Sequence, residues 1–287
     1  MKFAILFANV GPFVDPENLA RLGRKAEEVG FESLWTVEHA VVPCDYTAEY
    51  PYSNTGKMPG PENSPIPDPL LPLAYLAAVT ERIKLGTGVM ILPQRHPVYV
   101  AKEAATLDVL SKGRAILGVG VGWLHEEFAA LGIPFDDRGS RTRESVAAIR
   151  SLWADGPSTF SGKFFNWGPV ESHPKPVQAG GVPIVVGGHT ELAAKRAARY
   201  GNGFFPGRGD VPTLTKLFDA VAAECARVGR DAGEIELSAG FGGGGPDDVR
   251  RMEDLGVSRL AMGPPAFDIE GVERGLETFA DAVISKL

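Results

Sequence analysis

Short apolar runs alternate with amphipathic segments along the whole chain. The first apolar run, residues 2–7, precedes a segment in which Asp15 can cap a helix whose first position is Pro16. Apolar residues then recur with helical spacing at Leu19, Leu22, Ala26 and Val29. The first unit of the chain is therefore predicted to be a buried strand followed by an amphipathic helix.

The chain contains eight such units of a strand followed by a helix. The predicted strands are residues 2–7, 33–37, 83–91, 115–121, 183–186, 203–206, 234–239 and 258–262. The predicted helices are about 16–29, 69–80, 97–110, 124–131 with 141–154, 190–200, 213–228, 246–255 and 269–285. Strands that alternate with helices indicate a parallel sheet with right-handed crossovers. Eight such units fit one α/β domain, residues 1–287, folded as a closed (β/α)8 TIM barrel, whose chemistry lies where the strands end.

Two segments are too long to be simple connections. Residues 43–68, after the second strand, contain six prolines and almost no periodicity, and irregular segments of this length are usually functional or mobile. We expect this loop to cover the barrel mouth. Residues 157–182, after the fourth strand, are expected to form a hairpin that turns at Gly162 and Lys163.

Composition and charge narrow the class of partner. The net charge is −7 and the pI is near 5.4, which gives no indication of nucleic acid or of an anionic membrane. No apolar run approaches the roughly 20 residues of a membrane span. The first residues read as a strand and not as a signal peptide, and Cys44 and Cys225 are too distant in sequence for a disulfide framework. We expect a cytoplasmic protein with a small-molecule substrate.

Glycines gather near the ends of the third and fourth strands. Gly86 and Gly88 interrupt the third apolar run, and Gly118, Gly120 and Gly122 close the fourth. Because glycine permits close backbone approach, this pattern suggests that a flat group lies against these strands.

The same region carries a resemblance. The segments LGTGVMILPQRHP, AKEAATLDVLSKGR and LGVGVGW resemble the luciferase-like monooxygenase superfamily, and the similarity extends over nearly the whole chain. Glu38 and His39 after the second strand, with the loop after the third, look most like its coenzyme F420-dependent branch. That resemblance implies an oxidoreductase that passes a hydride between C5 of the deazaflavin and a small organic substrate.

His39 is the candidate catalytic residue. A lone histidine is usually structural, but its place after a barrel strand favours function. The resemblance puts it beside the cofactor ring, as proton donor or electrostatic partner. Histidine suits either role because its side chain gains or loses a proton near neutral pH. Glu38 is expected to line the same cofactor pocket, and its alternative role is to orient a neighbour.

The resemblance also implies the cofactor contacts. A non-proline cis peptide between Thr87 and Met90 would back the middle ring of the cofactor. The expected contacts are Thr87, Gly88, Val89, Gly120 and Gly122. The alternative for the third strand is an ordinary strand that its glycines weaken.

A second set of residues is predicted to bind the cofactor phosphate. Gly187, Gly188, His189 and Thr190 connect a strand to a helix, and free N–H groups at a helix start bind phosphate. The alternative is an ordinary capped turn. A GxGxxG pattern at Gly240, Gly242 and Gly245 is a second choice, because Asp247 and Asp248 in the first turn of its helix would repel phosphate.

Three further residues are candidate substrate contacts. Asn9 and Arg95 follow the first and third strands, and Trp123 follows the fourth. The alternatives are a salt bridge for Arg95 and packing against the next helix for Trp123. Sugar-phosphate dehydrogenases of the superfamily place an acidic residue near Trp123, so its absence argues against a sugar phosphate. His125 and Glu126 lack the HExxH spacing, so no metal site is predicted.

Two other functions compete with the first. An FMN-dependent luciferase-like monooxygenase would use dioxygen and reduced FMN from a separate flavin reductase. A non-catalytic barrel would bind the cofactor only, since fold does not fix function. Substrate choice is assigned to residues 43–68 and 157–182, and the resemblance implies a homodimer.

Overall fold

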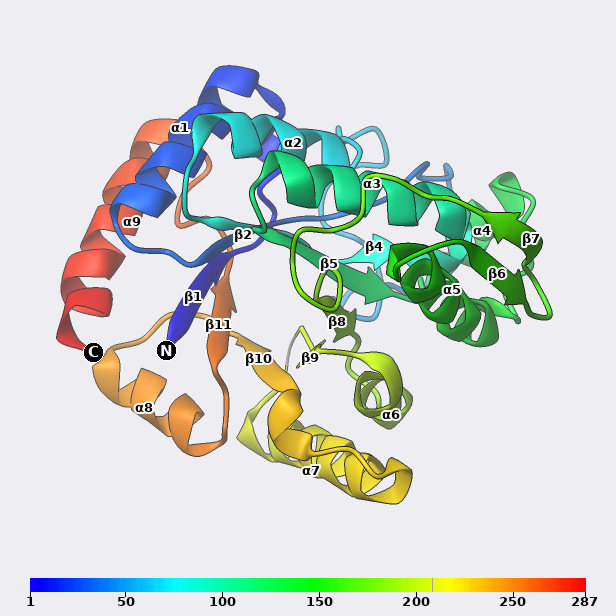
Figure 1. Cartoon of the computed structure of the whole chain (residues 1–287). Helices are drawn as coiled ribbons and strands as arrows, with labels where there is room; N and C mark the ends of the chain where they lie inside the picture. Colours follow the sequence, from blue (N-terminus) through cyan, green and yellow to red (C-terminus); the bar gives the residue numbers. More distant parts are fainter. Residues whose placement is uncertain (208) are drawn as a thin grey trace.

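The structure, a computed structural model, describes residues 1–207 and 209–287. Its centre is a parallel sheet that closes on itself, because β3 pairs with both β2 and β5 (Figure 1). The barrel strands are β1 (Lys2–Ile5), β2 (Ser33–Thr36), β3 (Lys84–Thr87), β5 (Ala115–Gly120), β8 (Ile184–Gly187), β9 (Gly203–Phe205), β10 (Glu236–Gly240) and β11 (Arg259–Met262). The predicted TIM barrel is confirmed.

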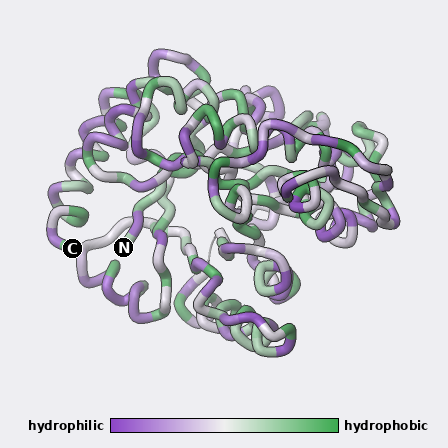
Figure 2. Tube along the Cα trace, viewed as in Figure 1, coloured by the Kyte–Doolittle hydropathy of each residue, from purple (hydrophilic) through white to green (hydrophobic). Residues whose placement is uncertain are grey.

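Helices surround the sheet, and α9 lies against α1 where the chain closes the ring (Figure 1). They are α1 (Pro16–Glu28), α2 (Leu70–Val79), α3 (Pro97–Leu110), α4 (His125–Ala130), α5 (Arg138–Trp153), α6 (Glu191–Tyr200), α7 (Val211–Val228), α8 (Pro246–Asp254) and α9 (Ile269–Ala282). Short 3-10 turns are η1 (Gly11–Val14), η2 (Leu92–Gln94), η3 (Ala232–Glu234) and η4 (Ile284–Lys286). Figure 2 shows hydrophilic residues along the outer turns of these helices.

The local sequence explains the first of these helices. The Asp15 carboxylate accepts hydrogen bonds from the backbone N–H groups of Glu17 and Asn18, both at 3.0 Å. Pro16 takes the first helical position, where no N–H is needed. The cap and the first residue of α1 are therefore as predicted.

The third predicted strand is divided. β3 ends at Thr87, a cis peptide joins Gly88 to Val89, and β4 (Met90–Ile91) resumes the pairing with β5. The expectation of a non-proline cis peptide between Thr87 and Met90 is confirmed.

Trp35 fills the interior of the barrel. Its side chain is 2% exposed and belongs to an inner cluster with Ala4, Ile116, Val185, Phe205 and Ala261. A Cβ added at Gly86 would lie 2.9 Å from the indole, and one at Gly118 would lie 1.8 Å from the Thr87 carbonyl oxygen. At these two positions the protein's own packing requires glycine, and contact with a flat ligand, which the sequence suggested, remains a prediction.

Val89 explains two more glycines. A Cβ at Gly120 would lie 2.5 Å from one methyl carbon of Val89, and a Cβ at Gly187 would lie 2.5 Å from the other. Gly122 has a φ of +79° and lies against Phe128. Three glycines that we expected to touch the cofactor thus make room for neighbouring side chains, which a single sequence does not reveal.

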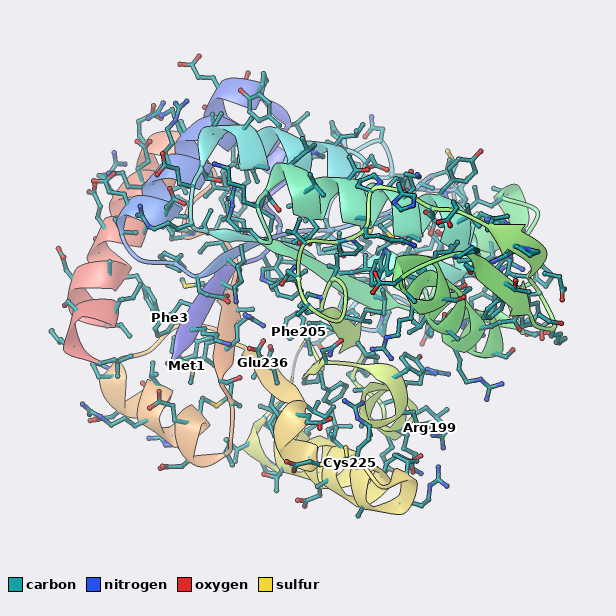
Figure 3. All side chains as sticks on the ribbon, in the orientation of Figure 1. Met1, Phe3, Arg199, Phe205, Cys225 and Glu236 are labelled. Carbon is teal, nitrogen blue, oxygen red and sulfur yellow. The ribbon has the colours of Figure 1, made fainter. Side chains whose placement is uncertain are left out.

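Ion pairs between charged side chains fill the opposite end of the barrel. Arg259 is 2% exposed, and its Nη2 lies 2.9 Å from Oε1 of Glu32. Its Nη1 pairs with Glu236, which also pairs with Lys2. Figure 3 shows Glu236 close to the start of the chain. Burial opposes ionisation of Glu32, but the hydrogen bonds and charge of Arg259 outweigh it and lower its pKa to about 2.

The two long segments differ in structure. β6 (Ser158–Ser161) and β7 (Asn166–Val170) pair as an antiparallel hairpin, as predicted. Between β2 and α2 the chain has neither a helix nor a strand. Within the described part of the chain, no helix has the length and apolar character needed to span a membrane.

The Glu32–Arg259 pair predicts acid sensitivity. A carboxyl whose pKa falls from 4.5 to about 2 on folding adds stability above pH 4.5 and loses it as the pH drops toward 2. Urea unfolding at several pH values should show Glu32→Gln to be less stable than wild type by up to about 3 kcal/mol at pH 7. The difference should shrink toward zero near pH 2. The exposed Glu62→Gln serves as control, and a difference that does not vary with pH would contradict the assignment.

Candidate active site

His39 and Glu127 meet at the carboxyl ends of the strands. His39 follows β2, and Glu127 lies in α4, which follows β5. The Nδ1 atom of His39 is 3.0 Å from Oε2 of Glu127, whose side chain is 0% exposed. The His39 ring packs edge-on against Trp123 at 5.8 Å between centroids. The loop after β2 and helix α4, which are distant in sequence, thus fix one imidazole at the rim where barrel enzymes carry out chemistry.

Asn9 has a structural position. It is fully buried, and its Nδ2 donates to the carbonyl oxygens of Val37 at 2.9 Å and Pro67 at 3.0 Å. Its Oδ1 accepts from the N–H of Val37 at 2.9 Å. The amide therefore ties the end of β1 to two points of the following chain. We expected Asn9 to contact substrate, but its side-chain amide is instead hydrogen-bonded to the backbone.

Glu38, which is buried, and Arg95, which is partly exposed, form an ion pair beside β4. Glu38 accepts from the N–H of Ile91, and from Nε of Arg95 at 2.7 Å. Nη2 of Arg95 also lies 2.6 Å from Oδ2 of Asp68. Burial raises the pKa of Glu38, and the charge of Arg95 offsets part of that rise. The pair anchors the strand beside the cis peptide, which corresponds to the structural alternatives for both residues.

Thr87 is also tied to the scaffold. It is 0% exposed, and its Oγ1 donates to the carbonyl oxygen of Gly118 at 2.7 Å. Gly88 and Val89, which form the cis peptide, are each partly exposed. Of the predicted contacts on this strand, Gly88 and Val89 are therefore available to a ligand, whereas the Thr87 side chain supports them from behind.

Aromatic rings from the long loop cross the barrel mouth. Trp123 contacts Tyr46 at 5.6 Å and Tyr50 at 5.1 Å between ring centroids. Tyr50 contacts Tyr52 at 5.6 Å, and Tyr52 contacts His189 at 5.0 Å. The row links the His39 side of the rim to the loop after β8. The long loop thus lies against the loops after β5 and β8, and a cover over the whole mouth remains a prediction.

Glu126 holds the base of this loop. Its Oε1 accepts from the N–H and the hydroxyl of Thr47, at 2.6 and 2.9 Å, and from the N–H of Ala48 at 3.2 Å. Desolvation opposes ionisation, but these hydrogen bonds outweigh it and lower the pKa of Glu126 to about 2. A carboxylate is thus a fixed anchor for the aromatic row.

The predicted phosphate loop forms a helix N-terminus. Gly188 has a φ of +130°, and the Thr190 side chain accepts from the N–H of Ala193 at 3.3 Å as the cap of α6. Glu191 lies in the first turn and pairs with Lys216 at 2.9 Å. The loop geometry is as predicted, and phosphate binding there remains a prediction.

In the GxGxxG loop, a carboxylate of the protein already occupies the position that a phosphate would take. The N–H of Gly245, at the start of α8, donates to the Asp248 carboxylate at 3.0 Å. Asp247 adds a second negative charge in the same turn. A phosphate would have to displace a carboxylate there, so the structure supports ranking this loop second.

Sequence reasoning missed several residues at this rim. Glu127 stands four residues after Trp123 in a helix that follows a strand, a position that marks candidates in this fold. Gln94, after β4, has buried side-chain nitrogen and oxygen atoms without a hydrogen-bond partner. Tyr50 and Tyr52 were hidden in a segment without periodicity. Among residues 1–207 and 209–287, no group of three or more His, Cys, Asp or Glu side chains is placed to hold a metal.

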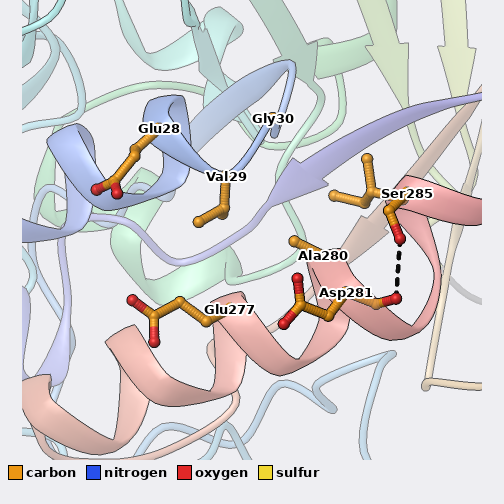
Figure 4. A pocket seen from close by; sticks show the side chains of 8 residues that line it. Glu28, Val29, Gly30, Glu277, Ala280, Asp281 and Ser285 are labelled. Atoms are coloured by element: carbon orange, nitrogen blue, oxygen red, sulfur yellow. Dashed lines mark hydrogen bonds between the residues drawn. The ribbon is translucent and has the colours of Figure 1, made fainter.

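A separate hollow of about 440 Å³ lies between the end of α1 and α9 (Figure 4). Glu28, Glu277 and Asp281 give it an acidic lining, and Ser285 donates to the Asp281 carbonyl oxygen at 2.9 Å. It lies where β2 begins, at the barrel end that serves stability and not chemistry.

Two curated relatives give the sequence context. An uncharacterised protein of Mycobacterium tuberculosis is 33% identical over 279 residues, which cover 93% of this chain and 94% of the relative. The F420-dependent glucose-6-phosphate dehydrogenase of Kineococcus radiotolerans is 32% identical over 227 residues, which cover 77% of this chain and 62% of that enzyme.

Solved structures agree with the fold. The monooxygenase RslO1 from Streptomyces bottropensis is 26% identical, with a TM-score of 0.79 over 100% of this chain and 99% of that one. An F420-dependent secondary alcohol dehydrogenase, solved with an F420-acetone adduct, is 17% identical with a TM-score of 0.80 over 99% and 98% of the two chains. The family model for luciferase-like monooxygenases matches residues 1–242. With the barrel and its rim already described, this match shows that the chain is an oxidoreductase belonging to the luciferase-like monooxygenase family.

Proposed function

We propose that this chain is a coenzyme F420-dependent oxidoreductase that acts on a small organic substrate. The observation that carries the proposal is His39, held at the barrel mouth by Glu127 and flanked by Trp123. An F420-dependent dehydrogenase that is 32% identical over 77% of the chain supports the choice of cofactor. The proposed activity goes beyond family membership, because the family also includes enzymes of other chemistry.

The residues of the rim fit such a cofactor. Gly88 and Val89 offer partly exposed backbone and an apolar side chain for a flat ring. The N-terminus of α6 offers N–H groups and a positive dipole end for a phosphate. The buried amide of Gln94 has neither a donor nor an acceptor partner, and buried polar groups are normally satisfied. A polar ligand group would supply what this amide lacks.

The roles of the protein follow from this arrangement. When bound, the deazaflavin would supply the hydride chemistry at C5. His39 would hold or move a proton at Nε2, the ring nitrogen that Glu127 leaves open. The row of Trp123, Tyr50 and Tyr52 would exclude water. The sugar-phosphate dehydrogenases of the superfamily have an acidic residue near the position of Trp123, and tryptophan has no acidic group. We therefore propose a substrate that is less polar than a sugar phosphate.

The second candidate is an FMN-dependent monooxygenase that uses dioxygen and a separate flavin reductase. Its support is the 26% identity to the monooxygenase RslO1 over the whole chain. Both candidates use the same ring and phosphate positions, so binding of the two cofactors is the first measurement. Under either candidate, the homodimer that the resemblance implies and the cytoplasmic location that the two distant cysteines suggest remain predictions.

Parallel titration of the apo protein with oxidised F420 and with FMN should separate the candidates. We expect micromolar binding of F420 and much weaker binding of FMN, followed by quenching of tryptophan fluorescence. Trp123 lies in the rim and provides the signal. Preferred binding of FMN would overturn the first candidate in favour of the monooxygenase. Binding of neither would overturn both cofactor assignments.

His39→Ala tests the catalytic assignment. Loss of a proton-transfer group typically reduces turnover by about 10²–10⁴-fold, while the affinity for F420 should stay close to that of wild type. The readout is the loss of deazaflavin absorbance with a panel of alcohols as hydride donors. His173→Ala is the control, because that side chain is 66% exposed and its ring pairs with Glu171. Full activity of His39→Ala would show that His39 is structural.

Glu191→Gln tests the phosphate loop. A negative charge in the first turn of a helix disfavours an anion there by roughly 0.3–1 kcal/mol, so its removal should tighten F420 binding about two- to five-fold. Binding of the deazaflavin without its phosphate should not change, and added salt should reduce the gain. Asp247→Asn makes the same charge change at the rejected GxGxxG site. A gain in Asp247→Asn alone would move the phosphate to α8.

A further inference from the structure

Glu127 is a fully buried carboxyl group without a Lys or Arg partner among the described residues. Its Oε1 accepts from the N–H groups of Ala40 at 2.7 Å and Val41 at 3.3 Å. Its Oε2 lies 3.0 Å from Nδ1 of His39. Burying such a group is costly unless it is hydrogen-bonded, and all of these contacts go to one three-residue segment. The group therefore serves that segment.

The two adjacent glutamates of α4 have separate tasks. Successive residues of a helix point about 100° apart, so Glu126 and Glu127 reach different parts of the same loop. Glu126 binds Thr47 and Ala48, whereas Glu127 binds residues 39–41. In the described part of the chain, no hydrogen bond or ion pair joins Glu126 to the His39 imidazole, which makes Glu126 a matched control for Glu127.

The contacts of Glu127 determine the proton on His39. An ionised carboxylate only accepts hydrogen bonds, so the Nδ1 atom that faces it must carry a hydrogen. A neutral imidazole with a hydrogen on Nδ1 has an unprotonated Nε2, whose lone pair is then the open position of the ring. A second hydrogen at Nε2 gives the imidazolium, and the same carboxylate stabilises that charge.

We propose that Glu127 is the positioning residue that holds His39 as its Nδ1-protonated tautomer, so that Nε2 takes and returns one proton during turnover. The role in turnover rests on the proposed function, whereas the tautomer is a property of the protein alone. The proton leaves a substrate hydroxyl, binds to the Nε2 lone pair and is later released to water. Glu127 itself gains and loses nothing in this step.

Glu127→Gln makes a sharp test possible. Because Ala40 and Val41 both present N–H groups, the carbonyl oxygen of the new amide faces them and its NH2 group faces His39. An NH2 group donates, so Nδ1 must become the acceptor and the hydrogen must move to Nε2. The substitution preserves the shape of the side chain and the contacts to the loop while it inverts the tautomer.

The measurement is a two-bond proton–nitrogen correlation spectrum of apo protein, isotope-labelled at the histidine ring nitrogens, in mildly alkaline buffer. Comparison with His39→Gln identifies the His39 signal among the five histidines. Wild type and Glu126→Gln should show the Nδ1-protonated form, and Glu127→Gln the Nε2-protonated form. An Nε2-protonated wild type, or a Glu127→Gln spectrum equal to that of wild type, would overturn the proposal. The wild-type spectrum tests the tautomer even if Glu127→Gln does not fold.

Kinetics separate this proposal from the proposed function. With a turned-over substrate, Glu127→Gln should lower kcat by roughly 10- to 100-fold, with the KM for F420 changed by less than about two-fold. A rise in KM with kcat unchanged would contradict a role in proton transfer. If neither cofactor supports turnover, the proposed function fails, while the spectra still decide the tautomer.

Discussion

The close packing of Trp35 and Val89 inside the barrel determines much of the remaining structure. Trp35 occupies the interior between the charged plug at Arg259 and the mouth. Gly86 leaves the space that the Trp35 indole occupies, Gly118 lies against the Thr87 carbonyl oxygen of the neighbouring strand, and Gly120 and Gly187 leave the space that the methyl groups of Val89 occupy. Interiors packed to this density tolerate little change in volume. The strand positions, and with them the rim, are set by these contacts.

The rim combines hydrogen-bonded supports with a loop that has no helix or strand. Asn9, Glu38 and Thr87 are polar residues whose side chains are committed to the scaffold by hydrogen bonds. They support the backbone on which His39 and Val89 stand. The cover is a segment without a helix or strand, tied at Thr47 by Glu126 and laid across the mouth by its tyrosines. The reactive groups of this site therefore stand on a scaffold that is fixed by hydrogen bonds, and the loop carries the residues that differ most in type from the scaffold.

Charge is used differently at the two ends of the barrel. At the closed end Arg259 is paired with Glu32 and Glu236, and the ion pairs compensate for burial. At the open end Glu127 has an imidazole and two N–H groups as partners. The Glu127 carboxyl group faces an imidazole that can exchange a proton, whereas Arg259 keeps its charge. We therefore relate the Glu127 contact to chemistry and the Arg259 contacts to stability.

The sequence by itself determined the eight strand and helix units, the first helix cap, the hairpin and the position of His39. These features depend on local periodicity and turn residues, which are read along the chain. The cis peptide and the family were anticipated from resemblance. Only the tertiary structure decided that Glu127 reaches His39, that the glycines serve Trp35 and Val89, and that Asn9 and Arg95 bind the scaffold. The partners in these contacts lie 27 to 98 residues apart in the chain, and no local pattern encodes such contacts.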